Sequence, residues 1–258
     1  MKRFLFTMLV VSLLCSPGFA EVISIRADQW CPYNCKPGAD KPGYMIEIAQ
    51  VVFKKAGHTV DYQELNWSRA ILETREGKHA AIVGAAKGDA PDFMFPDEPL
   101  GVMQNVFWAK KGTTWRFQGV ESLQQVRLGV IQDYDYGEII NAYVEEHQKN
   151  TLQVQIVSGT DGLEINIRKL ERGRINVTLE DQNVFAMKAS ELGKLELFEN
   201  IGPGGEQSVE ENFVYLAFSP ANPKSKEYAQ ILSEGIKAIR ASGDLQRILA
   251  RYGLKDWK

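Results

Sequence analysis

The chain has 258 residues, 24% of them charged, and a formal net charge of −3 at pH 7. This mild acidity, with no basic stripe and no run of alternating aromatic and cationic residues, excludes the usual kind of nucleic-acid interface. The length exceeds what a typical single hydrophobic core needs and favours two lobes.

Residues 1–20 have the pattern of a secretory signal peptide. Two cations precede an apolar run over residues 4–15, and small residues lead up to a predicted cleavage after Ala20. The run is too short for a permanent membrane span. Leu14 stands where a lipobox would need a small residue before Cys15, so we expect a free periplasmic protein rather than a lipoprotein. Cleavage would leave 258 − 20 = 238 residues with a net charge of −3 − 2 = −5.

Two cysteines follow this segment, Cys31 and Cys35, in the run Trp-Cys-Pro-Tyr-Asn-Cys. An oxidising compartment favours a local disulfide between them. A redox role is the alternative, but three residues separate the thiols instead of two. A metal site would need further ligands, which the three scattered histidines do not supply. We therefore expect a structural disulfide, and no metal or cofactor.

Strands and helices alternate along the chain from residue 22, which predicts parallel sheets covered by helices. The helices are recognised by apolar residues spaced three and four apart, and the strands by short apolar runs. In the first part, the predicted elements are a strand over 22–26, a helix from Met45 to Phe53 ended by Gly57, a strand over 59–63, a helix capped by Ser68 and ending near Gly77, and a strand ending at Gly84.

The second part repeats the theme before two terminal helices. The predicted elements are an extended run over 102–109, a strand over 128–131, a helix around 139–144, a strand over 154–157, a helix over 162–171, a strand ending at Asp181, a loop over 202–205, a strand over 212–218, a helix over 228–239, and a last helix capped by Asp244. No repeat of fixed period and no low-complexity tract interrupts this order.

The order of these elements, with Lys-Pro-Gly-Tyr-Met-Ile-Glu-Ile-Ala over 41–49 and Phe-Pro-Asp-Glu-Pro over 95–99, resembles family 3 of the periplasmic solute-binding proteins. The resemblance runs from Val22 to the last helix. It implies an α/β, two-lobed fold of the type II periplasmic-binding-protein kind, in which each lobe is a mostly parallel sheet flanked by helices. Two crossover strands would join the lobes.

The same resemblance implies the lobe boundaries and the state of the protein. Lobe 1 would comprise residues 21–111 and 212–258, and lobe 2 residues 112–211. The protein would be a monomer whose lobes close by a hinge around a ligand.

Four aromatic residues match or neighbour positions where the family stacks rings on its ligand. Trp30 follows the first strand, and Trp67 comes just before the second helix at a second aromatic wall. Tyr33 and Tyr44 are further candidates. For each of them the alternative is ordinary packing in the core or on the surface.

The family's carboxylate site is altered in this chain. Gly84, Ala85 and Ala86 occupy the segment whose backbone groups and hydroxyls usually hold an α-carboxylate, and the hydroxyls are absent. Amino-acid binders carry an Arg a few residues later, whose planar fork binds the carboxylate. Residues 87–93 contain no Arg, a loss of about 2–5 kcal/mol of binding free energy. A standard α-amino acid is therefore not expected, although Lys87 could substitute as a point charge.

The second lobe shows a similar change over residues 132–137, where the family has a Gly-Thr turn. Asp133, Asp135 and Tyr136 stand there, and an Asp near a helix N-terminus would fill the anion position itself. The alternative is that these acids only cap the helix. Asp181 matches the family's ammonium-binding carboxylate, whose hydrogen bond to a cation contributes about 1.5–3 kcal/mol; a solvated acid at a strand end is the alternative.

These features favour a non-catalytic protein that binds a small polar solute, cationic or rich in hydroxyls, and delivers it to an ABC permease. A periplasmic sensor read by a membrane partner is the second possibility. The third is an enzyme on the same fold, resembling periplasmic dehydratases, with Glu180, Asp181, Asp133 or Asp135 as general acid. The sequence holds no nucleophile elbow, phosphate loop, dinucleotide fingerprint or paired histidines.

Overall fold

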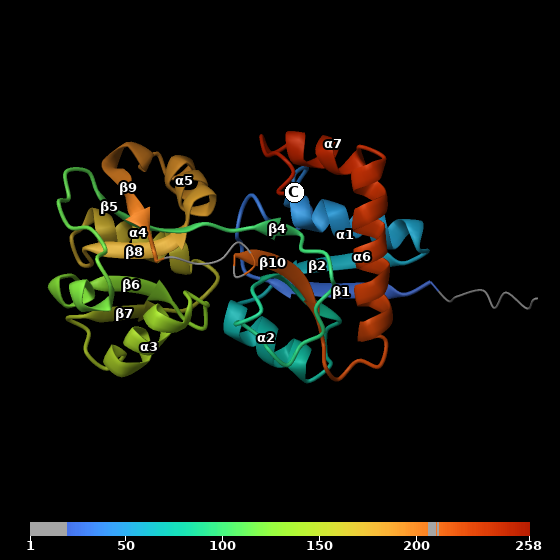
Figure 1. Cartoon of the computed structure of the whole chain (residues 1–258), viewed down its shortest axis with the longest axis horizontal. Coiled ribbons are helices and arrows are strands. Elements are labelled where there is room, and N and C mark those ends of the chain that lie inside the picture. The colour runs from blue at the N-terminus through green and yellow to red at the C-terminus, as the bar shows by residue number, and fades with distance from the viewer. Residues whose placement is uncertain (1–19, 206–209, 211) are drawn as a thin grey trace, which may run out of the picture.

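The structure is a computed structural model that describes residues 20–205, 210 and 212–258. The predicted signal segment before Ala20, with Cys15, lies outside the described residues. Figure 1 shows two α/β lobes side by side. Each lobe contains one five-stranded sheet flanked by helices.

The first sheet has the order β2-β1-β3-β10-β4. β1, β2 and β3 pair in parallel, β10 runs antiparallel to β3 and β4, and so four of the five strands run the same way. The elements of this lobe are β1 (Val22–Ala27), α1 (Tyr44–Lys55), β2 (Thr59–Glu64), α2 (Trp67–Arg75), β3 (Ala81–Ala85), β4 (Gly101–Val102), β10 (Phe213–Phe218), α6 (Ser225–Ala241) and α7 (Asp244–Ala250).

The second sheet repeats this plan in the order β7-β6-β8-β5-β9, with β5 as the strand that runs against its neighbours. Its elements are β5 (Asn105–Lys110), β6 (Leu128–Ile131), α3 (Glu138–His147), β7 (Val154–Val157), α4 (Gly162–Glu171), β8 (Val177–Asp181), α5 (Gln182–Glu191) and β9 (Phe198–Pro203), with 3-10 turns at Val120–Gln125 and Leu195–Leu197. The predicted two-lobed fold is confirmed.

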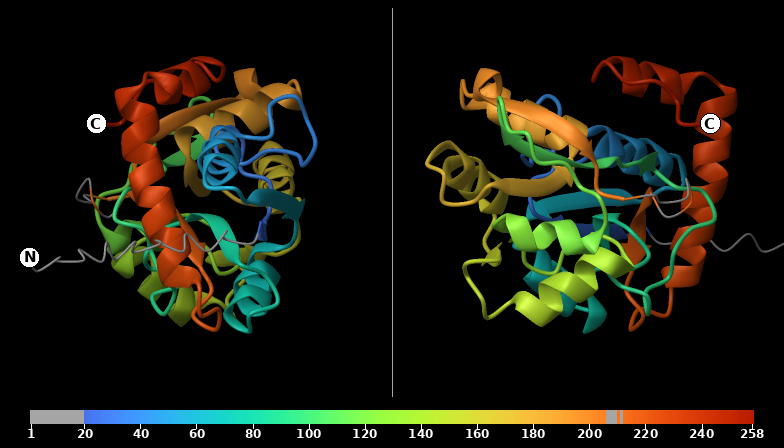
Figure 2. Two further views of the ribbon diagram at one scale, coloured as in Figure 1. Left: turned by 90° about the vertical axis from the view of Figure 1, so that its right-hand side faces the viewer. Right: turned by 60° about the vertical axis from the view of Figure 1, so that its left-hand side comes forward.

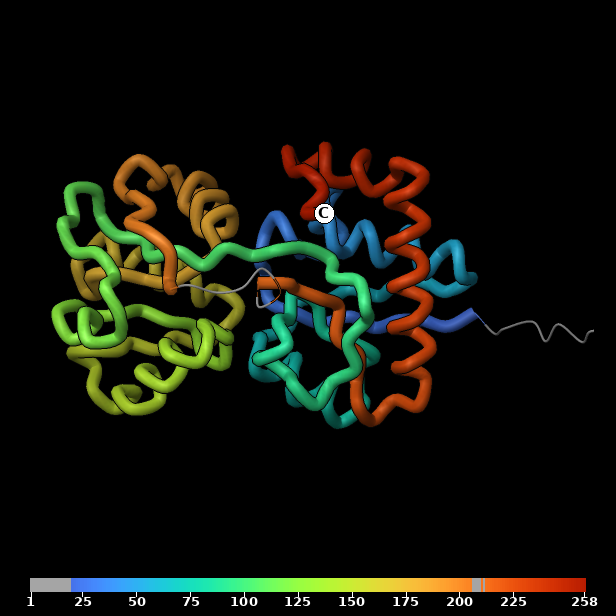
Figure 3. Tube along the Cα trace, viewed as in Figure 1, coloured from blue at the N-terminus to red at the C-terminus, as the bar shows by residue number. Residues whose placement is uncertain are grey.

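The chain passes from the first sheet to the second between β4 and β5, at Met103 and Gln104 (Figure 3). The sequence placed all residues up to 111 in lobe 1, whereas β5 pairs within the second sheet. The extended apolar run over 102–109 does not reveal at which residue the chain stops pairing with the first sheet and begins to pair with the second. The return follows β9 and leads into β10.

The predicted helices are all present, whereas α5 was not predicted from the sequence. On α1, Met45, Ile48, Ala49 and Phe53 are buried against the first sheet and α6. The N-cap of α2 is Asn66, whose side chain accepts a hydrogen bond from the amide of Arg69, so the predicted cap at Ser68 is wrong. The predicted cap at Asp244 is wrong in the same way: Gly243 precedes α7 in a left-handed conformation, and Asp244 is its first residue.

Helix α6 covers the end of the first lobe that faces away from the second (Figures 1 and 2). Its buried side chains include Tyr228, Leu232, Ile236 and Ile239, as the apolar stripe predicted. Gly235 allows the close approach to α1, because a Cβ there would lie 2.2 Å from a methyl carbon of Val52. The helix thereby fixes the first lobe without reaching the face that meets the second lobe.

Candidate functional site

A small cavity lies where the lobes meet, at the carboxyl ends of β1, β3 and β8. Its volume is about 30 Å³, room for about two water-sized molecules. Neighbouring parallel strands end at a common edge, so residues from distant parts of the sequence gather there. The lining residues are Asp28, Trp30, Asn34, Trp67, Val83, Gly84 and Asp89, together with Met103, Asn105, Tyr134, Asp135, Tyr136 and Glu180.

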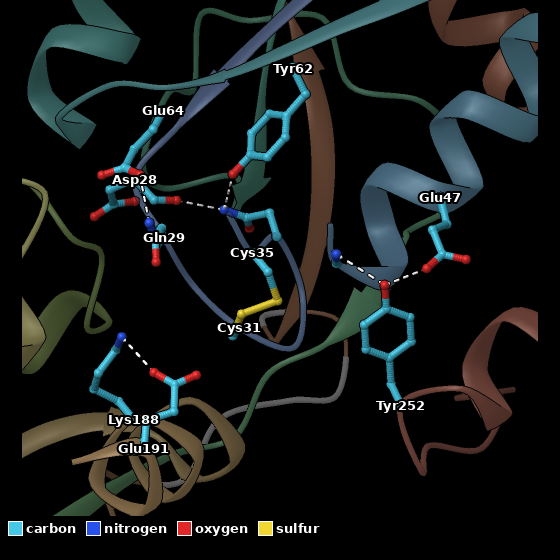
Figure 4. The surroundings of a disulfide bond; sticks show 12 residues. Asp28, Gln29, Cys31, Cys35, Glu47, Tyr62, Glu64, Lys188, Glu191 and Tyr252 are labelled. Atoms are coloured by element: carbon cyan, nitrogen blue, oxygen red, sulfur yellow. Dashed lines mark hydrogen bonds and ion pairs between the residues drawn. A yellow bond between two sulfur atoms is a disulfide. The ribbon is translucent and has the colours of Figure 1, made fainter. Parts of the chain in front are cut away.

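One turn after β1 carries three of the lining residues, Asp28, Trp30 and Asn34. The predicted disulfide between Cys31 and Cys35 is confirmed and closes this turn (Figure 4). The amide nitrogen of the Asn34 side chain donates to the backbone oxygen of Asp28 at 2.7 Å. The turn is therefore held covalently and by hydrogen bonds before any ligand contacts it.

Hydrogen bonds run directly from one lobe to the other, so the lobes are closed on each other. Five bonds join a donor of one lobe to an oxygen of the other: Trp30 Nε1 to Glu180 Oε1 at 2.9 Å, the Tyr33 hydroxyl to Asp181 Oδ2 at 3.0 Å, Trp67 Nε1 to the Asp133 carbonyl at 3.0 Å, the Tyr134 hydroxyl to Asp28 Oδ2 at 2.7 Å, and the Asp135 amide to Asp89 Oδ1 at 3.0 Å. Four of these acceptors are carboxyl oxygens, so closure depends on acids.

The acids that line the cavity have no cationic partner there. Burial raises the pKa of Glu180 to about 8, against the opposing hydrogen bond from Trp30. Burial, and then the nearby Asp135, raise the pKa of Asp89 to about 8. Burial raises the pKa of Asp28 to about 7. Among the described residues, neither Lys nor Arg lines the cavity. With pKa values of about 7 to 8, these acids are largely protonated near neutral pH, and they become uncompensated negative charges only at higher pH.

The backbone amide at the end of β3 is already occupied by an acid. The amide of Ala86 donates to Asp89 Oδ2 at 2.7 Å, and Asp89 Oδ1 accepts from the amide of Asp135. In the second lobe, Asp135 Oδ1 accepts from the amide of Gly137 at 2.9 Å and from the side chain of Asn141 at 2.7 Å. Carboxylates of the protein thus fill the positions at which backbone amides could hold an anionic ligand group.

The whole of this architecture is shared with known proteins. A family model described as bacterial extracellular solute-binding proteins, family 3, matches residues 23–255. The chain belongs to this family. Its members are non-catalytic binding proteins, so the dehydratase-like alternative is set aside.

Three relatives illustrate the match. A probable histidine-binding protein of Campylobacter jejuni is 21% identical, over 89% of this chain and 83% of the relative. A structure from work on glutathione import through a cystine ABC importer of Streptococcus mutans has a TM-score of 0.75 at 18% identity, covering 92% of this chain and 98% of that one. A histidine kinase sensor domain similar to periplasmic binding proteins has a TM-score of 0.71 at 17% identity, covering 90% and 95%.

In this family 3 protein, five of the residues predicted from the sequence line the cavity: Trp30, Trp67, Gly84, Asp135 and Tyr136. The indole N–H groups of both tryptophans are used in bonds between the lobes. The Tyr136 hydroxyl accepts from the amide of Ile131 at 2.8 Å, which fixes its ring under the cavity.

Other predicted residues lie behind the cavity wall. Tyr33 stacks on Trp30 with ring centroids 4.1 Å apart, and Tyr44 packs on Tyr33 in the core of the first lobe. Ala85 is buried in β3, and Ala86 contributes its amide to Asp89. These residues support the site instead of facing it.

Two charged residues predicted as ligand contacts point elsewhere. Lys87 is exposed, and its ammonium lies 5.7 Å from the centre of the Tyr215 ring, in an outer groove. Asp133, in a left-handed conformation, is exposed and contributes only its carbonyl, to Trp67. Lys87 therefore does not take the place of the missing Arg in this closed form.

Asp181 is buried but does not line the cavity. It is the N-cap of α5: its Oδ1 accepts from the amides of Asn183 and Val184. Its Oδ2 accepts from the amide of Gln104 and from the Tyr33 hydroxyl. Both oxygens are thus engaged by donors of the protein.

Sequence reasoning missed several lining residues: Asp28, Asn34, Val83, Asp89, Met103, Asn105 and Tyr134, while Glu180 was named only for the enzyme alternative. A signal for two of them was present. Asp28 comes directly after β1, and Glu180 is the second-last residue of β8, at the sheet edges where ligands of open α/β folds bind.

Proposed function

We propose that this protein binds, in the cleft between its lobes, a small solute that carries a cationic nitrogen and no carboxylate. The observation that carries the proposal is the set of acids around the closed cavity, Asp28, Asp89, Asp135 and Glu180, without a Lys or Arg among the described lining residues. Buried acids are retained as anions only where a cation or several hydrogen bonds compensate them. A cationic ligand supplies that compensation.

The backbone amides that could bind an anion are already occupied, which supports the same conclusion. A ligand carboxylate would compete with Asp89 for the amide of Ala86 and with Asp135 for the amide of Gly137. It would also lie among acids, with no planar fork to bind it. The curated relative is named a probable histidine-binding protein, but among the described residues that line the cavity there is no Lys or Arg to hold the carboxylate of histidine.

The biological role follows from the family. We place the mature protein in the periplasm as a monomer, released by cleavage after Ala20, where it delivers its solute to an ABC permease. Among the described residues, no helix has the length and apolar character required to span a membrane. A sensory role is the second candidate, favoured by the likeness to a histidine kinase sensor domain. Permease and ATPase genes beside this gene would favour import, and a kinase gene would favour sensing.

Isothermal titration calorimetry of the mature protein at pH 8.5 tests the ligand class. The panel contains alkylamines, guanidines, histidine, glutamate, glutathione and a neutral sugar. We expect saturable binding of a carboxylate-free cation and affinities for histidine and glutamate lower by about thirty-fold or more, the equivalent of at least 2 kcal/mol. Tight binding of histidine or glutamate, with alkylamines inert, would overturn the proposal.

A further inference from the structure

Two acceptor atoms in the cavity wall have no hydrogen-bond partner. They are the side-chain oxygen of Asn34, Oδ1, and the second carboxyl oxygen of Glu180, Oε2. The two residues are 1% and 2% exposed, and both line the cavity. Buried polar atoms in proteins have a hydrogen-bond partner in the large majority of cases. Two buried acceptors without a partner in a binding cavity therefore indicate a ligand.

The orientation of both groups is fixed by their other atoms. Asn34 donates from Nδ2 to the carbonyl of Asp28, so its oxygen points away from that turn and lies beside Gly84, where a Cβ would come within 3.1 Å of it. Glu180 Oε1 accepts from Trp30 and from the amide of Asp181, both at 2.9 Å. Each residue therefore keeps one unpaired acceptor in the wall of the cavity, held in place before a ligand arrives.

Asn34 Oδ1 and the ionised form of Glu180 both accept hydrogen bonds, so together they require a ligand that donates them, and the charge of the Glu180 carboxylate favours one that is positively charged. We propose, resting on the function proposed above, that Asn34 Oδ1 and Glu180 Oε2 together bind a nitrogen cation that bears N–H groups, such as a primary ammonium, an amidinium or a guanidinium. A quaternary ammonium is excluded from this position because it has no hydrogen on nitrogen and would leave both acceptors buried and unpaired.

The aromatic residues of the cavity raise the competing possibility of a quaternary ammonium bound by ring faces. The geometry of the rings disfavours it. Tyr33 covers one face of Trp30, and the ring of Tyr134 stands edge-on to Trp67, with an angle of 81° between their planes. The aromatic rings therefore form the side walls of the site, and the two oxygens determine which head group of the ligand can bind.

A metal ion is the other cation that carboxyl groups could hold. Among the residues that the structure describes, no three His, Cys, Asp or Glu side chains gather closely enough to hold one. The acids of the cavity are instead spread around its wall, each with its own protein donor. An organic cation with separated N–H donors matches this arrangement.

The inference is tested with ligands of one skeleton and different heads: propylammonium, propylguanidinium and propyltrimethylammonium, titrated at pH 8.5, with calcium chloride as the inorganic probe. We expect at least one N–H-bearing head to bind, and propyltrimethylammonium to bind about thirty-fold more weakly or not at all. Equal or tighter binding of the trimethylammonium would overturn the inference but leave the proposed function standing. Saturable calcium binding would overturn it too, whereas a protein that binds none of the cations but binds histidine contradicts both.

Two variants locate the contact. Glu180→Gln removes the charge but keeps an oxygen for Trp30, and Asn34→Ala removes the other acceptor; each should weaken binding of the N–H-bearing cation by about 10- to 100-fold. Glu196→Gln is the matched control, because Glu196 is exposed on the second lobe, where it pairs with Lys111, and lies outside the cavity lining. Circular dichroism establishes that each variant is folded. Unchanged affinity in a folded Glu180→Gln protein would refute the contact.

Discussion

Glu180 and Asp181 are neighbours at the end of β8, yet their carboxyl groups have different surroundings. Side chains alternate along a strand, so one of the two faces the cavity and the other faces the junction with β5 and α5. The resemblance to the family pointed to Asp181, which the structure uses as a helix cap. Sequence reasoning identified the right strand end but not the right face, because the face depends on register.

The acids of the cavity make the stability of the unliganded protein depend on pH. Asp89 has a pKa of about 8 in the folded protein, raised first by burial and then by Asp135, against an ordinary value of 3.8. Between these values the folded state binds more protons than the unfolded state, so the free energy of unfolding falls as pH rises. Asp89→Asn removes this loss. We expect the difference in the free energy of unfolding, variant minus wild type, to be more positive at pH 8 than at pH 5 by about 1–3 kcal/mol. Urea denaturation at the two pH values measures this difference.

The control for this prediction is Asp92→Asn. Asp92 pairs with Arg75 on the surface, and the hydrogen bond from Arg75 lowers its pKa. Both folded and unfolded states are then ionised at Asp92 above pH 5, so the effect of this substitution should be the same at pH 5 and pH 8. If the effect of Asp89→Asn on the free energy of unfolding were also the same at pH 5 and pH 8, the raised pKa of Asp89 would be contradicted.

At the scale of elements, most of the fold was predictable because apolar spacing is a local property. Helix α1, with its buried stripe from Met45 to Phe53, and helix α6 lie where the sequence placed them. Trp30 and Trp67 were found through the resemblance to the family, which has aromatic residues after the first strand and just before the second helix. Lys87 could not be placed, because nothing local indicates that it turns outward onto Tyr215.

The turn between β1 and α1 depends on the disulfide between Cys31 and Cys35, which closes a loop of sequence separation 4. For so short a loop, loop-closure entropy predicts a stabilisation of about 2 kcal/mol. The double substitution Cys31→Ser, Cys35→Ser should lower the free energy of unfolding by about that amount. It should also weaken ligand binding, because Asn34 lies within the released loop and Trp30 directly precedes it. Urea denaturation and calorimetry measure the two effects.

The wild-type protein treated with a reductant serves as the control and should behave like the double variant. Cys35 is buried, so incomplete reduction is detected by counting free thiols. Full affinity in the double variant would show that the hydrogen bond from Asn34 to Asp28 holds the turn without the covalent link.

At the scale of the whole molecule, closure has opposing contributions. Five hydrogen bonds join the lobes, but four of them end on carboxyl groups. As these groups lose their protons, their mutual repulsion penalises the closed form. A bound cation removes the penalty, and a ligand shifts the equilibrium only by the difference between its affinities for the two forms. Ligand-driven closure therefore follows from the charge of the cavity.

Gly88 gives a direct test of closure, because it faces Asp135 across the cleft and lies outside the cavity lining. A Cβ at Gly88 would lie 1.8 Å from Asp135 Oδ2, and the other oxygen of Asp135 is held by Gly137 and Asn141. Gly88→Ala should hinder closure while sparing each lobe. We expect weaker ligand binding and, at saturating ligand, a larger radius of gyration in small-angle X-ray scattering. Adding Asp135→Ala removes the collision and should restore the smaller radius of gyration. If Gly88→Ala alone closes fully, Gly88 and Asp135 do not meet in the closed form.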